Sequence, residues 1–94
     1  MKKQNVLEAA RKMSAGGFQS DKAAAKIEQG FVDGDVIPMS AERCIRIEGD
    51  KATGYKGDTA ENSFNLADMP AAQLEQLMAA YIVKHYPVAA HKVY

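Results

Sequence analysis

Large side chains recur every three or four residues along the segment 70–86, at Leu74, Leu77, Met78, Tyr81, Ile82 and His85. Residues at this spacing share one face of an α-helix, which has about 3.6 residues per turn. The pattern predicts a helix over residues 70–86, with Pro70 in its first turn and Pro87 at its end. The apolar face of this helix must be buried against another element.

Two shorter helices are predicted before it, over residues 3–14 and 21–29. Gly16 and Gly17 end the first helix, and Ser20 is the predicted N-cap of the alanine-rich second helix. The apolar face of the first helix consists of Val6, Leu7, Ala10 and Met13. Residues 30–40 are expected to be a connector with limited strand character, because the proline at position 38 excludes a central strand.

Between the helices, short segments with alternating apolar and polar residues predict strands at 43–48, 51–56 and 62–66. Glycine-aspartate pairs between these segments favour turns. The side chains expected on the inward face are Ile45, Ile47, Tyr55, Phe64 and Leu66. We therefore expect an α+β fold, in which two N-terminal helices precede a three-stranded antiparallel β-meander and the C-terminal helix packs on the sheet.

The length of 94 residues fits one domain over 1–94, since domains typically have about 50–250 residues. We expect a helical part at 1–30, a mostly β part at 31–69, the helix at 70–86 and a tail at 87–94. Cys44 is the only cysteine, and one unpaired thiol favours the reducing cytoplasm. Since no segment resembles a signal peptide or a membrane span, we expect a cytoplasmic protein that does not bind membranes.

Charge is balanced overall, with 12 basic and 12 acidic residues, but it is unevenly distributed. Residues 1–30 carry six basic and three acidic side chains, whereas residues 31–69 carry four basic and eight acidic ones. A basic N-terminal face and an acidic sheet can each orient a charged partner. The basic part also leaves open an alternative, nucleic-acid binding by the first two helices, with contacts from Lys12, Lys22 and Lys26.

Candidate catalytic and metal-binding residues are few. Cys44 with His85 or His91 would supply a nucleophile and a base, but no glycine-rich oxyanion loop adjoins the cysteine. The acidic residues from Asp33 onward do not have the ligand spacing of an EF-hand calcium loop. We therefore expect no catalytic residue, no metal site and no cofactor.

The sequence thus predicts a small non-enzymatic interaction or regulatory protein that binds another protein and forms a homodimer. The alternative is a DNA-binding regulator that uses its basic N-terminal helices. Self-association is expected because a short chain without disulfides buries little surface and the first helix has an apolar face to cover. The predicted partner or dimer interface comprises Val6, Leu7, Ala10, Met13, Phe18, Phe31 and Tyr94.

Overall fold

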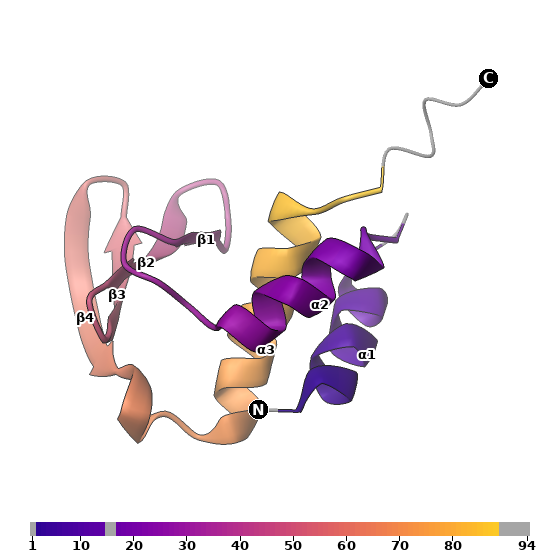
Figure 1. Ribbon diagram of the computed structural model, residues 1–94. Coiled ribbons are helices and arrows are strands. Elements are labelled where there is room, and N and C mark those ends of the chain that lie inside the picture. Colours follow the sequence, from indigo (N-terminus) through magenta and orange to yellow (C-terminus); the bar gives the residue numbers. More distant parts are fainter. Residues whose placement is uncertain (1, 15–16, 89–94) are drawn as a thin grey trace.

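The computed structural model describes residues 2–14 and 17–88, which form three α-helices and one four-stranded sheet (Figure 1). The helices are α1 (Lys3–Met13), α2 (Ser20–Gln29) and α3 (Ala71–His85), and the short 3₁₀ helix η1 (Leu66–Asp68) precedes α3. The strands are β1 (Val36–Pro38), β2 (Arg43–Glu48), β3 (Lys51–Lys56) and β4 (Thr59–Asn65). The α+β class, the antiparallel sheet and the C-terminal helix packed on it are confirmed.

The sheet has the order β1-β2-β3-β4, with every neighbouring pair antiparallel. The expectation of three strands is wrong, because Val36–Pro38 forms a fourth strand along β2. This strand has only three residues and contains Pro38, so its sequence carries almost no strand pattern. Pro38 is tolerated here because β1 lies at an edge of the sheet, where a missing N–H breaks no ladder.

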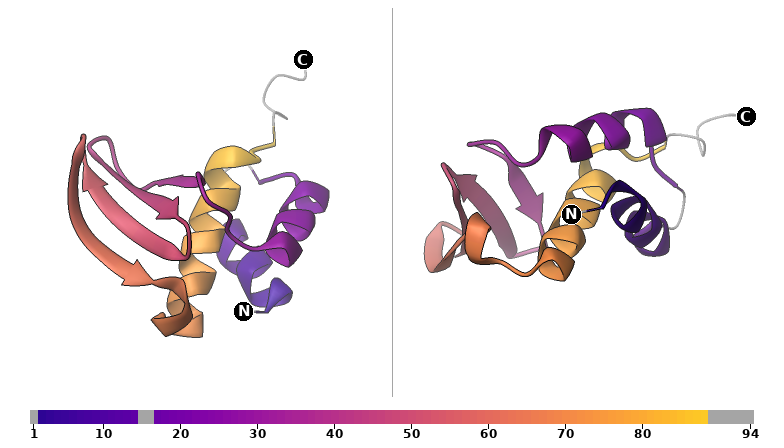
Figure 2. Two further views of the ribbon diagram at one scale, coloured as in Figure 1. Left: turned by 60° about the vertical axis from the view of Figure 1, so that its left-hand side comes forward. Right: turned by 60° about the horizontal axis from the view of Figure 1, so that its bottom comes forward.

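Helix α3 lies in the middle of the molecule, between the sheet and the other two helices (Figure 2). On one side it forms a cluster with the sheet that comprises Ile37, Ile47, Ala52, Leu77 and Tyr81. On the other side it packs with α1 and α2 in a cluster of Val6, Ala10, Phe18, Ala23, Ile27, Met78, Ala79 and Ile82. The predicted burial of Leu77 and Tyr81 is confirmed, since they are 6% and 9% exposed.

Two of the side chains predicted on the inward face are not part of the core. Tyr55 lies on the opposite face of the sheet, where its hydroxyl donates a hydrogen bond to Glu48 and the Arg46 guanidinium lies 4.5 Å from its ring centroid. Phe64 is on the side of α3 but remains 56% exposed. Its strand, β4, lies at the sheet edge far from β1, the strand that packs most closely on α3 (Figure 1).

Candidate functional site: a groove between the sheet and α3

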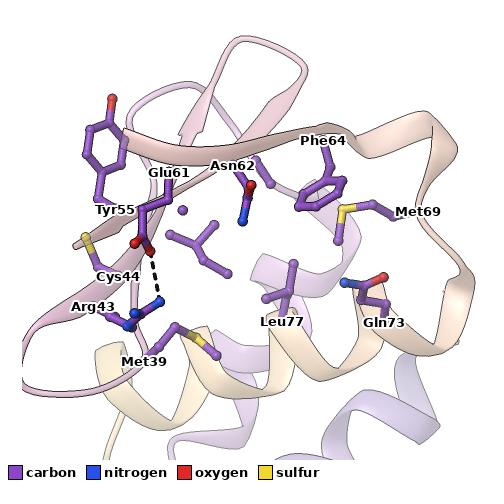
Figure 3. A pocket seen from close by; sticks show the side chains of 13 residues that line it. Met39, Arg43, Cys44, Tyr55, Glu61, Asn62, Phe64, Met69, Gln73 and Leu77 are labelled. Atoms are coloured by element: carbon purple, nitrogen blue, oxygen red, sulfur yellow. Dashed lines mark hydrogen bonds and ion pairs between the residues drawn. The ribbon is translucent and has the colours of Figure 1, made fainter. Parts of the chain in front are cut away.

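An open apolar groove of about 240 Å³ lies between α3 and the outer half of the sheet (Figure 3). Leu77 points from α3 toward the sheet, and Asn62 points from β4 toward α3. "The groove" denotes the space lined by Met39, Arg43, Cys44, Ile45, Ala52, Gly54, Tyr55, Glu61, Asn62, Phe64, Met69, Gln73 and Leu77. Tyr55 borders it only at the margin, because its ring points away from the groove (Figure 3). It exposes more apolar than polar surface, and its rim includes Met39 and Phe64, which are 50% and 56% exposed.

The groove exists because β3 presents two very small residues to α3. Ala52 and Gly54 lie directly opposite Ile47 and Ile45 on β2, so all four share the face that α3 covers. A Cβ atom added at Gly54 would have only the Asn62 carbonyl oxygen near it, at 3.8 Å. Since Gly54 is not among the glycines with positive φ, a larger residue would fill the groove without backbone strain.

A β-bulge at the edge of the sheet determines which polar side chains enter the groove. Gly54 pairs with Asn62 while the next residue, Tyr55, pairs with Ala60, so Glu61 is an extra residue in β4. In consequence Glu61 and Asn62 both point into the groove although they are consecutive (Figure 3). Glu61 Oε1 accepts a hydrogen bond of 2.8 Å from Arg43, which closes one end of the groove with an ion pair.

Two carboxamides face the apolar lining, Asn62 on β4 and Gln73 on α3. Neither side chain forms a hydrogen bond to any residue that the structure describes. Each carboxamide carries both a donor and an acceptor, which is also the hydrogen-bonding pattern of a peptide group. The groove can therefore hold an apolar group and pair with a polar backbone beside it.

A second cluster of polar side chains is buried where α2, α3 and the start of β1 meet. Lys26 Nζ lies 2.7 Å from Asp35 Oδ2, and the two side chains are 4% and 10% exposed. Asp35 also accepts hydrogen bonds from the Val32 N–H and the Tyr81 hydroxyl, at 2.9 and 3.4 Å. Lys26 Nζ lies 4.9 Å from the Tyr81 ring centroid, a cation–π distance. Because these groups satisfy one another, the cluster holds the sheet against the helices.

Stability should fall at alkaline pH because of Tyr81. Its burial, followed by the nearby charge of Asp35, raises the pKa of its hydroxyl from 10.0 to about 12. A raised pKa in the folded state contributes stability below pH 10 that is lost as the pH rises to about 12. We expect Tyr81→Phe to remove this part of the pH dependence in denaturation experiments. An unchanged alkaline profile in the variant would contradict the assignment to Tyr81.

The sequence predicts no catalytic residue, and Cys44 and His85, the candidate nucleophile and base, lie in different surroundings, while His91 is outside the described residues. Cys44 lines the groove, whereas His85 stacks on Tyr81 with 4.1 Å between ring centroids and lies 2.7 Å from the Val36 carbonyl oxygen. Lys26, one of three predicted nucleic-acid contacts, is only 5% exposed and paired with Asp35, while Lys12 and Lys22 are exposed. Within residues 2–14 and 17–88, no three His, Cys, Asp or Glu side chains gather in a way that suits a metal ion.

The predicted partner interface is largely used within the chain. Val6, Ala10 and Phe18 are buried in the cluster with α3, and Leu7 and Phe31 pack against the buried residues. Met13 is 44% exposed, and the predicted interface residue Tyr94 lies outside the described residues. The apolar face of α1 is therefore covered by α3 within the chain. Whether these residues contact another chain stays a prediction.

The sequence pattern did not predict the groove, whose best signal is the pair of small residues Ala52 and Gly54 at inward positions of β3.

None of the described helices has both the length and the apolar character needed to cross a bilayer. The chain matches no family model, no curated protein and no solved structure.

Proposed function

We propose that this protein is a small non-enzymatic binding protein that holds an apolar side chain of another protein in the groove. The observation that carries the proposal is the open hollow over Ala52 and Gly54, which is flanked by the exposed side chains of Phe64 and Met39. Burying large apolar side chains in such pockets supplies much of the affinity of protein interfaces.

The size of the groove suits one anchoring side chain better than a complete small-molecule ligand. Pockets that enclose drug-sized ligands have volumes of about 300–1,000 Å³. The groove is smaller, about 240 Å³, and open on one side. Interface anchors fill compact pockets of this kind while the rest of the partner stays outside. A partner segment that lies across the opening would fit this shape.

A display selection with groove variants tests the proposal. The wild-type protein is used as bait for a random peptide library, and enriched peptides are then measured against two neighbouring β3 variants. Gly54→Val fills the groove, whereas Thr53→Val changes the preceding residue, whose side chain lies on the opposite face of the sheet and pairs with Ser63. We expect binding to weaken by about tenfold or more in Gly54→Val, since the anchor pocket is lost. Thr53→Val should bind like wild type.

Two results would contradict the proposal. One is a selection that enriches no peptide, and the other is a set of peptides whose affinity is the same for Gly54→Val and wild type. Circular dichroism of both variants checks that the fold is retained.

The predicted homodimer is a separate part of the proposal and needs its own measurement. Sedimentation of the chain at micromolar concentration should give about twice the mass of 10.2 kDa. Repeating the measurement with Gly54→Val shows whether the groove contributes to self-association. A clean monomer would refute the dimer without affecting the binding of another protein.

A further inference from the structure

The face of the protein around the groove combines a hollow with an exposed apolar side chain. The hollow lies over Ala52 and Gly54, and Phe64 lies beside it on the neighbouring strand β4, where it pairs with Ala52 (Figure 3). Phe64 is 56% exposed, the largest exposed fraction among the large apolar side chains of the described residues, and Met39 across the groove is 50% exposed. Contiguous apolar surface of this kind marks a site of interaction with another chain.

A hollow and an exposed side chain on one face complement each other between two copies of the same chain. A twofold dimer uses the same surface of both copies, so each contact is made twice. A twofold axis in the plane of contact, midway between Phe64 and the centre of the groove, carries each Phe64 into the opposite groove. A phenyl ring is a large apolar anchor of the kind that fills compact interface pockets, and the groove has about 240 Å³. Such a dimer is closed, so it does not grow into a filament.

The polar groups at the groove are compatible with a second copy. Arg43 and Glu61 are the charged residues that line it, and they pair with each other at 2.8 Å. Lys56 lies opposite Arg43, at the end of the groove away from Phe64, so an axis near Phe64 keeps the basic ends of the two copies apart (Figure 3). The carboxamides of Asn62 and Gln73 each carry a donor and an acceptor, so they can pair with the same groups of another copy.

The face is also large enough for a modest dimer interface. The groove has 13 lining residues, and an adjoining hollow, which shares Phe64, Met69 and Gln73 with it, adds four more. The total of 17 residues approaches the about 20–30 residues on each side of a stable interface. A second copy would also supply the burial that a chain of 94 residues without a disulfide lacks.

We propose that a second copy of this chain fills the groove when no partner is bound, with each copy inserting Phe64 between Leu77 and Gly54 of the other. This inference rests on the part of the proposed function that makes the groove a site for one apolar side chain, and it names the first occupant. Because Phe64 and a partner side chain need the same space, self-association and partner binding exclude each other. The dimer is therefore the closed form of the protein, and the separate chain is the form that binds.

Sedimentation equilibrium over chain concentrations from about 1 to 200 µM tests the inference. Phe64→Ala removes the inserted side chain and keeps the groove, whereas Gly54→Val fills the groove and keeps Phe64. Each variant should weaken self-association by about tenfold or more, because an aromatic anchor and its pocket carry much of the energy of an interface. The matched control is Met13→Ala on α1, where the side chain is 44% exposed and far in sequence from the groove, and it should associate like wild type.

An equal mixture of Phe64→Ala and Gly54→Val gives the sharpest result. The first variant offers an open groove and the second offers Phe64, so one of the two insertions can form between them. We expect the mixed pair to associate more tightly than either variant alone, which loss of folding in one variant would not produce. Unfolding of Phe64→Ala is compared with wild type at concentrations at which the copies are separate, so that it reports on the single chain.

Partner binding supplies the last readout. A peptide enriched by the groove selection should convert the wild-type dimer into single chains, since both occupants use the same space. A peptide that binds the dimer without dissociating it would refute the mutual exclusion.

The remaining outcomes separate the inference from the proposed function. A wild-type chain that stays monomeric, a dimer that Phe64→Ala and Gly54→Val leave unchanged, or a mixture that does not associate would overturn the inference. The proposed function would stand in these cases if Gly54→Val weakens peptide binding. A dimer that Met13→Ala dissociates and Phe64→Ala does not would place the interface on α1. A dimer with the expected behaviour and a selection that enriches no peptide would support the inference and contradict the binding of another protein.

Discussion

Truncating Leu77 to alanine should lower the free energy of unfolding by about 2–5 kcal/mol, the usual range for a buried leucine. Leu77 is 6% exposed and packs between α3 and the sheet with Ile37, Ile47 and Ala52. A chain of 94 residues has little stability to spare, so the variant should be partly unfolded at physiological temperature. Chemical denaturation followed by circular dichroism measures the loss.

Phe64→Ala is the matched control for this prediction. Phe64 lines the same groove as Leu77 but is 56% exposed, so its truncation should cost less than about 1 kcal/mol. The sequence pattern alone predicts burial, and hence a large effect, for both residues. Equal losses for the two variants would show that Phe64 is buried and that the groove is closed in solution.

Replacing Asp35 with alanine should cost about 3–5 kcal/mol at neutral pH, because the buried ammonium of Lys26 is left without its partner. Burial acts to raise the pKa of Asp35, but hydrogen bonds from Lys26 and Val32 and the charge of Lys26 outweigh it and lower the pKa below 3.8. A lowered pKa in the folded state stabilises the fold above the unfolded-state pKa. This contribution is lost as the pH falls through the folded-state value.

The difference in stability between wild type and Asp35→Ala should therefore be constant near neutrality and should shrink in acid. Glu61→Ala is the control, since its ion pair with Arg43 is also 2.8 Å long but the side chains are 35% and 55% exposed. Exposed pairs contribute about 0–1 kcal/mol, so this variant should lose little stability. A loss for Asp35→Ala no larger than that for Glu61→Ala would contradict a structural role of the buried pair.

The predictable parts of the fold are those with a long periodic pattern. The stripe from Leu74 to His85 repeats over three turns, and α3 ends within a residue of its predicted bounds. Strand β1 lacks any such pattern because it has three residues, one of them proline. Alternation also shows which side chains of a strand share a face, but not whether an element covers that face. For this reason the sequence predicts a core position for Phe64, which lies at the groove rim.

The groove and the buried Lys26–Asp35 ion pair depend on how several elements pack together, which no local sequence pattern predicts. The groove forms because Ala52 and Gly54 are very small residues at inward positions of β3. Patterns of large apolar or reactive residues do not reveal such positions. Lys26 on α2 and Asp35 in the loop before β1 lie nine residues apart, and each alone resembles a solvated surface charge. Their contact requires the turn after α2 to bring residue 35 back against that helix.

Glu61, the extra residue in β4, affects whether copies of this chain can pair through the edges of their sheets. Strand β4 is the last in the sheet, and among the described residues no strand pairs with its outer side. Open edges of this kind promote fibril growth, and natural proteins block them with bulges and charged residues that point inward. Glu61 supplies both, because it interrupts the ladder and carries a carboxylate on the covered face. The residue that shapes the groove thereby also protects the chain from edge-to-edge aggregation.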